Sequence, residues 1–78
     1  MAYYMEFDAG TGICLALHET EGEVHRVQEG SLIKEIEAEM ADSILNDDLP
    51  LWLYKLEPTG EIKQITPDEY FQIVAPEK

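Results

Sequence analysis

EPTGEIKQI (residues 57–65) has a near-double earlier in the chain, ETEGEVHRV (residues 19–27), and these two segments decide the fold that we predict. In each segment, three residues ending in glycine stand between two glutamates: Thr20-Glu21-Gly22 and Pro58-Thr59-Gly60. A three-residue hairpin loop commonly joins a type I turn to a residue with positive φ, which suits glycine, and proline suits the first turn position. Each segment therefore predicts a β-hairpin in which the two flanking glutamates face each other.

The residues before the first segment predict two more strands, over residues 3–7 and 13–18, separated by the turn-rich DAGTG. Residues 23–28 are predicted as a third strand, the second arm of the first hairpin. One register gathers apolar side chains on a single face of the first two strands. It sets these pairs opposite each other: Phe7 and Ile13, Met5 and Leu15, Tyr3 and Leu17. In the second hairpin the expected pairs are Leu56 with Ile62 and Leu53 with Ile65.

A helix is predicted after each hairpin. Ser31 is the expected N-cap of the longer one, and apolar residues follow it at helical spacing: Leu32, Ile33, Ile36, Met40, Ile44 and Leu45. The second helix has three start signals, which are a Thr66 cap, Pro67 at the first position and Glu69 completing a capping box. Its expected buried side consists of Tyr70, Phe71, Ile73 and Val74.

The predicted order is therefore β-β-β-α-β-β-α, within one small domain over residues 1–78. A single hairpin and a single amphipathic helix cannot each bury an apolar face alone, so both hairpin–helix units should share one core. We predict an α+β fold with a mostly antiparallel sheet of about five strands and two helices.

The charge is the most unusual property of this sequence. Seventeen Asp and Glu residues against five Lys and Arg give a formal net charge of −12. Direct binding to nucleic acid or to an anionic membrane is disfavoured, because both need cationic side chains. Two interpretations of the acid remain open: it only makes the protein soluble, or it presents carboxylates to a partner with a basic surface.

Two groups of acidic residues are candidate sites for such a partner. On the predicted long helix, Glu35, Glu39 and Asp42 stand at i, i+4 and i+7, and the row continues past the helix end with Asp47 and Asp48. The first predicted hairpin carries the second group: Glu19, Glu21, Glu23 and Glu29. Arrays of carboxylates can stand in for the phosphates of nucleic acid. We therefore predict a non-catalytic inhibitor or regulator of a nucleic-acid-binding protein, such as an anti-restriction or anti-CRISPR inhibitor encoded by a phage or another mobile element.

The alternative prediction rests on the aromatic segment LWLYKL (residues 51–56). Strand alternation sends Trp52 and Tyr54 to one side and Leu51 and Leu53 to the other. The segment is then either a central strand covered on both faces, or a surface on which Trp52 and Tyr54 anchor a partner or a homodimer. In that second case the protein is an antitoxin-like or accessory binding module, and its acid only solubilises it.

No catalytic residue, cofactor or metal site is predicted. Cys14 is the only cysteine, which excludes an intramolecular disulfide, and its apolar neighbours are typical of a buried thiol. His18 and His25 lack a convincing third metal ligand and are expected to be structural. The stretch GTG (residues 10–12) lacks the lysine of a phosphate-binding loop. We see no signal peptide or membrane-spanning run and expect a cytoplasmic protein.

Overall fold

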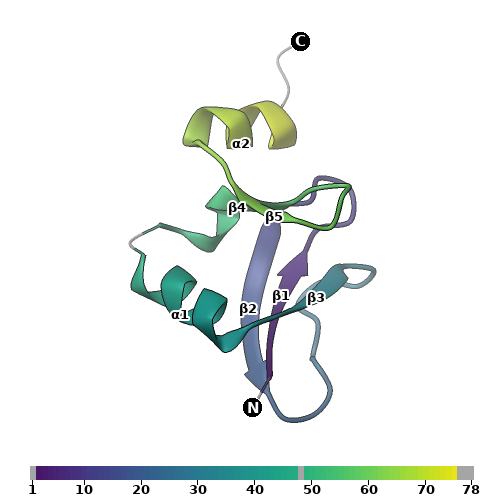
Figure 1. The fold of residues 1–78 in the computed structure, drawn as a ribbon. Helices are drawn as coiled ribbons and strands as arrows, with labels where there is room; N and C mark the ends of the chain where they lie inside the picture. Colours follow the sequence, from purple (N-terminus) through teal and green to yellow (C-terminus); the bar gives the residue numbers. More distant parts are fainter. Residues whose placement is uncertain (1, 48, 76–78) are drawn as a thin grey trace.

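The computed structural model describes residues 2–47 and 49–75. Its elements, drawn in Figure 1, are β1 (Ala2–Phe7), β2 (Cys14–Thr20), β3 (Leu32–Ile36), α1 (Ala38–Asn46), the 3₁₀ helix η1 (Leu51–Leu53), β4 (Tyr54–Leu56), β5 (Ile62–Gln64) and α2 (Pro67–Val74). The α+β class and the order β-β-β-α-β-β-α are as predicted. The strands, however, form two antiparallel sheets, with three strands in one and two in the other.

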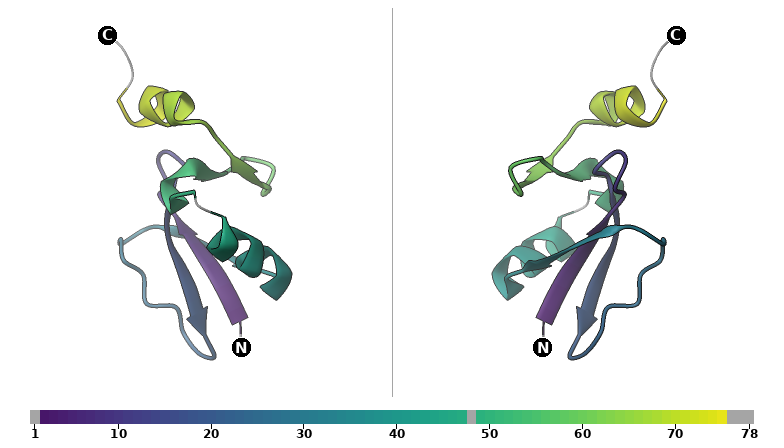
Figure 2. Two further views of the ribbon diagram at one scale, coloured as in Figure 1. Left: turned by 90° about the vertical axis from the view of Figure 1, so that its left-hand side faces the viewer. Right: turned by 90° about the vertical axis from the view of Figure 1, so that its right-hand side faces the viewer.

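The larger sheet has the order β2-β1-β3, with β1 in the centre. Both neighbours are antiparallel to β1, so β2 and β3 run parallel to each other. Parallel strands need a connection that crosses the sheet. Residues 21–31, which we call the crossover loop, make this connection. Figure 2 shows the sheet lying between the crossover loop on one face and α1 on the other.

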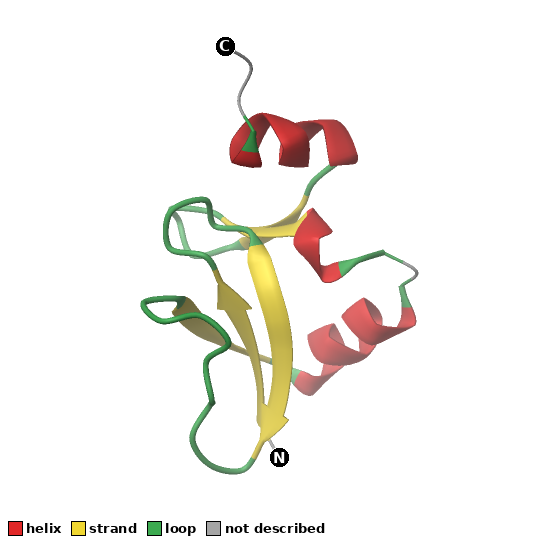
Figure 3. Cartoon of the chain, turned by 180° about the vertical axis from the view of Figure 1, so that it is seen from behind, coloured by secondary structure: helices red, strands yellow, loops and turns green. Residues whose placement is uncertain are grey.

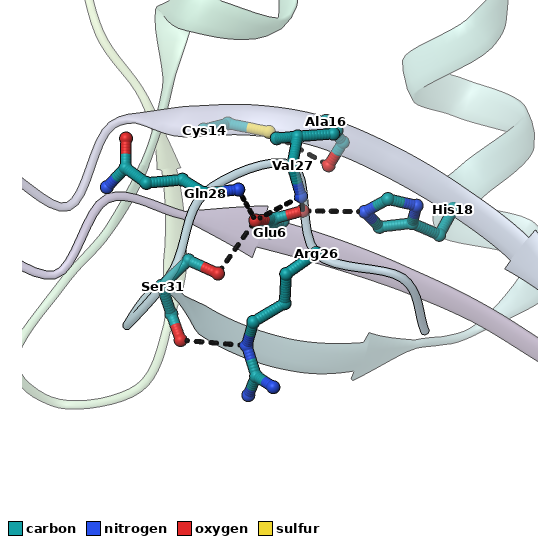
Figure 4. Close-up of polar contacts among 8 residues, drawn as sticks. All are labelled: Glu6, Cys14, Ala16, His18, Arg26, Val27, Gln28 and Ser31. Carbon is teal, nitrogen blue, oxygen red and sulfur yellow. Dashed lines mark hydrogen bonds and ion pairs between the residues drawn. The ribbon is translucent and has the colours of Figure 1, made fainter. Parts of the chain in front are cut away.

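The crossover loop is held by one side chain of the central strand. Glu6 is fully buried, and its carboxylate accepts hydrogen bonds from the backbone N–H groups of Val27 (2.9 and 3.0 Å) and Gln28 (3.0 Å), as Figure 4 shows. The hydroxyl of Ser31 donates a further hydrogen bond of 2.7 Å, and Nε2 of His18 lies 2.8 Å from the same carboxylate. Burial alone would raise the pKa of Glu6, but these hydrogen bonds outweigh it and lower the pKa to about 2. The anchor is therefore an ionised carboxylate.

The third strand is not the segment that the sequence predicted. Residues 23–28 belong to the crossover loop, and residues 32–36, which were predicted as the start of a helix, form β3. The physical reason is that the N–H groups of Val27 and Gln28 bind Glu6 instead of a neighbouring strand. The free edge of β1 then pairs with residues 32–36, which brings Ile36 into the core.

The predicted N-cap and the predicted first hairpin are also wrong. Ser31 is buried against Glu6 ahead of β3, and α1 begins only after Glu37. β2 continues through Thr20, so Glu19 pairs with Tyr3 of β1 and not with the second glutamate of its segment. The first segment has threonine where the second has proline, and its glycine does not adopt the positive φ that a three-residue turn needs.

The pairing of β1 with β2 is shifted from the predicted register. Met5 lies opposite Leu17 rather than Leu15, and Phe7 lies opposite Cys14. An irregularity between Glu6 and Phe7 leaves Leu15 without a partner on β1, as in a β-bulge. Apolar alternation alone could not show this extra residue.

The second repeated segment forms the predicted hairpin. Leu56 pairs with Ile62, and the N–H of Ile65 donates to the carbonyl of Leu53 at 2.7 Å, as expected. Gly60 has a φ of 95°, the left-handed conformation that the turn requires. The two copies of one local sequence thus adopt different structures.

Among the described residues, two apolar clusters form the interior. The main one lies between the larger sheet and α1 and includes Met5, Phe7, Cys14, Ile36, Ala41, Ile44 and Tyr54. The smaller one lies beneath α2 and consists of Ile13, Leu53 and Ile65, with Tyr70 and Ile73 packed against it.

α2 begins with the predicted capping box of Thr66 and Glu69, with Pro67 in its first turn. No residue of its predicted buried side is fully buried: Tyr70 and Ile73 are half-buried, whereas Phe71 is 58% and Val74 42% exposed. The body of the protein is too small to cover the whole apolar side of this helix.

Gly12 joins the two sheets. Its carbonyl accepts a hydrogen bond of 2.8 Å from the N–H of Leu56, and the next residue, Ile13, forms a bridge with Lys55. Gly12 has a φ of 80°, and a Cβ added there would lie 2.8 Å from the carbonyl oxygen of Leu56. A side chain at this position would therefore push the sheets apart.

We expect Gly12→Ala to lower the free energy of unfolding by at least about 3 kcal/mol, because the new methyl group adds a backbone clash to the strain of a positive φ. Gly30→Ala is the matched control: Gly30 also has a φ of 80°, but open space surrounds it. The control should cost only about 1–2 kcal/mol. Urea denaturation measures both, and equal losses would contradict a tight contact at Gly12.

The Glu6 anchor predicts a specific pH dependence. The pKa of Glu6 in the folded state is about 2, below its ordinary value of 4.5, so the stability it contributes is complete above pH 4.5 and is lost as the pH falls toward 2. Glu6→Gln should lower the free energy of unfolding at neutral pH by about 2–4 kcal/mol and flatten this acid slope. Glu21→Gln, at an exposed position, should keep the slope. Urea denaturation across this pH range tests the prediction, and parallel slopes in all three proteins would refute it.

Candidate functional site: an acidic surface where β3 meets α1

Five exposed acidic residues surround the end of the larger sheet where β3 leads into α1. We call this surface the acidic end, and it consists of Glu19, Glu35, Glu37, Glu39 and Asp42. β2 supplies the first of them, β3 the second, the turn after β3 the third, and α1 the last two. The site is thus assembled from three elements around the edge of one sheet.

Tyr3 of β1 connects two of these carboxylates. It lies opposite Glu19 on one side and Ile36 on the other, and its hydroxyl donates a hydrogen bond of 3.2 Å to the Glu19 carboxylate. The negative charge of Glu19 and, more weakly, that of Asp42 raise the pKa of the Tyr3 phenol. Carboxylates from β2 and α1 therefore act on the same phenol.

The turn from β3 into α1 gathers the other three. Glu35, Glu37 and Glu39 line one shallow hollow together with Met40 and Ser43, and the first two also line a second hollow beside Tyr3. The predicted helical row of Glu35, Glu39 and Asp42 does not exist, because Glu35 lies on a strand. The strand-to-helix turn brings the acids together instead.

Part of this acid has a structural benefit. Glu37 is the N-cap residue of α1, although its side chain makes no capping hydrogen bond, and Glu39 lies in the first turn. Carboxylates at a helix N-terminus interact favourably with the helix dipole, typically by about 0.3–1 kcal/mol each. Glu19, Glu35 and Asp42 lie elsewhere and gain nothing from this effect.

The negative charges of the acidic end are not paired with positive side chains of the described residues. Within residues 2–47 and 49–75, the salt bridges are Glu57 with Lys55, Glu69 with Lys63, and Glu6 with His18 if the ring is protonated. None of these pairs includes a residue of the acidic end. Lys34 lines the same hollow as the glutamates, but it makes no salt bridge among these residues.

The remaining predicted acidic residues are placed differently. Glu21 and Glu23 are exposed on the crossover loop, just after the end of β2 that pairs with Ala2. Asp47 is the C-cap residue of α1, and its carboxylate accepts a hydrogen bond of 3.1 Å from the Tyr54 hydroxyl. Asp47 therefore ties α1 to β4. Asp48 lies outside the described residues.

The predicted aromatic surface is rearranged. Leu51–Leu53 forms a 3₁₀ turn rather than a strand, so Trp52 and Tyr54 do not share a strand face. Tyr54 is buried, and burial together with the nearby Asp47 raises its pKa. Trp52 is 36% exposed, and its ring centroid lies 4.5 Å from that of Tyr70 on α2. Trp52 therefore packs against the ring of Tyr70 on α2.

Several features with catalytic or binding potential are occupied by structural contacts. The N–H groups of Gly10 and Thr11, which could have cradled an anion, donate to the carboxylate of Asp8 at 3.1 and 2.9 Å. Cys14 is buried, and burial raises the pKa of its thiol to about 11, which makes it a poor nucleophile.

The described residues include no cluster of three or more His, Cys, Asp or Glu placed to bind a metal ion. No described helix is both long and apolar enough to span a membrane.

Sequence reasoning missed Tyr3 and Glu37 at the acidic end. The predicted register put Tyr3 opposite Leu17, in an apolar row. The pairing of Phe7 with Cys14 shifts the register by one residue and the bulge shifts it by one more, which places Tyr3 opposite Glu19. In the predicted long helix, Glu37 only flanks the row of Glu35, Glu39 and Asp42, whereas in the structure it is the N-cap residue of α1. The alternation of charged and uncharged residues in EIEAE (residues 35–39), which fits a strand, was the available signal for a different element.

The arrangement around Tyr3 can be tested without any partner. Glu19→Gln should lower the pKa of the Tyr3 phenol toward its ordinary value of 10.0, and Asp42→Asn should lower it less, because Glu19 is the larger cause of the shift. Glu61→Gln, at an exposed position after the second turn, should leave it unchanged. NMR titration of the tyrosine ring carbons measures each value. If Glu19→Gln leaves the pKa of Tyr3 unchanged, the described contact between Tyr3 and Glu19 is wrong.

Comparisons with protein-family models, with curated proteins and with solved structures gave no match for this chain.

Proposed function

We propose that this protein is a non-catalytic acidic binding protein that occupies the basic surface of a nucleic-acid-binding protein and so inhibits or regulates it. The observation that carries the proposal is the acidic end, where five exposed carboxylates gather without a salt bridge among the described residues. The net charge of −12 gives the chain a long-range field of the same sign as nucleic acid.

The physical argument concerns the cost of gathering like charges. Neighbouring carboxylates repel each other, and the helix dipole relieves this only for the two at the start of α1. A partner rich in Lys and Arg would relieve the repulsion for all five. The same charges would steer its approach and speed association.

The finer form of the proposal is nucleic-acid mimicry. Carboxylates held by β2, β3 and α1 would take the places of phosphates in a basic groove. Restriction enzymes and CRISPR nucleases have such grooves, so we propose an anti-restriction or anti-CRISPR inhibitor of phage or mobile-element origin. Binding of this kind weakens as salt rises, because the charges are screened over about 8 Å at physiological ionic strength.

A second candidate rests on Trp52 and α2. The rings of Trp52, Tyr70 and Phe71 form a chain with centroid distances of 4.5 and 5.5 Å at the protein surface. An antitoxin-like or accessory binding module would use these aromatic rings as its anchors. In that case Trp52→Ala would abolish binding, and salt would have little effect.

The proposal predicts competition with DNA. A panel of restriction enzymes and guide-RNA nucleases would be assayed for binding to labelled duplex DNA, with this protein as competitor at several salt concentrations. This protein should displace the DNA from at least one enzyme of the panel, and the displacement should weaken as the salt concentration rises. The double variant Glu35→Lys and Glu39→Lys should raise the inhibition constant at least about tenfold, since each reversal replaces attraction by repulsion.

The matched control reverses the same number of charges elsewhere. Glu29→Lys with Glu61→Lys alters two exposed glutamates outside the acidic end and should change inhibition less than about threefold. If a binding partner is found whose affinity responds neither to salt nor to the first double variant, the mimicry proposal is wrong. Equal effects of both double variants would show that net charge matters and the acidic end does not.

A further inference from the structure

β3 is an edge strand whose sequence also fits a helix. One apolar stripe at helical spacing runs through both β3 and α1: Leu32, Ile33, Ile36, Met40 and Ile44. No glycine or proline occurs in the sequence between residues 31 and 49 to separate a strand from a helix. The surrounding fold, and not the segment itself, therefore imposes the strand form.

A single residue, Glu37, joins β3 to α1. We call β3 and Glu37 together, residues 32–37, the junction segment. Glu37 has a φ of −76° and a ψ of 153°, so its φ already suits a helix and only its ψ is extended. Its side chain makes no capping hydrogen bond, so α1 lacks the usual stabilising cap at this position. The helix can therefore be continued backward through the junction segment without breaking a cap.

The path of the chain leaves room for this continuation. Thr20, the last residue of β2, pairs with Ala2, and Ile36, the last residue of β3, pairs with Tyr3. β2 therefore ends, and α1 begins, toward the same end of the larger sheet, the end nearest the N-terminus in Figure 3. At present the crossover loop runs to the opposite end of β1, and β3 brings the chain back over about 20 Å. As a helix, the junction segment would span only about 9 Å, and the loop would have a shorter path to cover.

The Glu6 anchor holds the junction segment in its strand form. Glu6 accepts hydrogen bonds from Val27 and Gln28 of the crossover loop and a hydrogen bond of 2.7 Å from the hydroxyl of Ser31, directly before β3. These contacts fix the start of β3 beside β1, which is its neighbour on one side only. Without Glu6, the Ser31 hydroxyl would be free to accept a backbone N–H bond as a helix N-cap.

We propose that the junction segment is a conformational switch: when the crossover loop leaves Glu6, residues 32–37 leave β1 and join α1 in one helix over residues 32–46, with Ser31 as its N-cap. Ile36 then stands four positions before Met40, on the side of the helix that faces the main cluster, so its apolar contacts are kept. Two packings of one sequence can coexist when their free energies are close.

The switch rearranges the acidic end. In the strand form Glu35 lies opposite Tyr4 of β1. In the helix it would stand four positions before Glu39 and seven before Asp42, in one row whose charges repel each other. This repulsion favours the strand form in the isolated protein, so we expect the helix as a minor state with a population of about 0.1–10%. The inference goes beyond the proposed function and does not depend on it.

Glu6→Gln tests the switch in the intact protein, because its amide has one acceptor oxygen where the carboxylate has two. The ¹³Cα chemical shifts of the junction segment distinguish a strand from a helix. We expect them to move toward helical values in the variant, with a helical population at least about tenfold that of the natural protein. Saturation-transfer NMR measures the minor state of the natural protein.

A matched pair of substitutions at the exposed Glu35 separates a helix from general loosening. In the Glu6→Gln protein, Glu35→Ala favours a helix, whereas Glu35→Thr favours a strand. The helical population should be at least about threefold higher with alanine than with threonine. The same two substitutions at Glu61, which is exposed and outside the junction segment, should give equal populations.

Strand or random-coil shifts in the junction segment of the Glu6→Gln protein would overturn the proposal, as would equal populations for the two Glu35 substitutions. Should Glu6→Gln unfold the whole chain, the natural protein decides. Its minor state, in which the amides of Val27 and Gln28 are released, must show helical shifts in the junction segment, and the lack of such a state also overturns the switch. No partner is used, so the DNA competition assay judges the proposed function separately.

Discussion

The contact between the buried carboxylate of Glu6 and the crossover loop determines the arrangement of the larger sheet. Residues 21–31 have no regular structure of their own, and the N–H groups of Val27 and Gln28 find their acceptor on the central strand. The same carboxylate holds Ser31, the residue that immediately precedes β3. Glu6 therefore places β3 along the free edge of β1, and through β3 it positions α1 and the acidic end.

The predictable parts of this fold are those whose signals are local. Pro58 and Gly60 specify the second hairpin, and Thr66 with Glu69 specifies the start of α2, within a few residues each. The third strand depends instead on Glu6, which is 21 residues from Val27 in the sequence. The apolar spacing of residues 32–36 fits a helix and a strand equally well, so only the free edge of β1 decides between them.

The structure places the predicted acidic residues in a geometry that the sequence did not show. Glu19, Glu35, Glu39 and Asp42 come from three different elements around one end of the larger sheet, not from one helix and one hairpin. A shift of one residue where Phe7 pairs with Cys14, and a bulge that adds one more, bring Tyr3 opposite Glu19, and no periodicity reveals either. Likewise, the pattern in α2 identified its apolar side chains, but only the size of the body beneath it shows that Phe71 stays exposed.

The sheet order β2-β1-β3 has a consequence for the sequence of events in folding. β1 and β2 are joined by a short turn and can pair early, but β3 reaches the other edge of β1 only after the crossover loop has passed over the sheet. Until that happens, Glu6 is exposed to water on an unfinished face. Its desolvation and the closure of the loop must then occur together, because a carboxylate is costly to bury before its donors arrive. The slow step of folding should therefore be docking of the loop, after the first strand pair has formed.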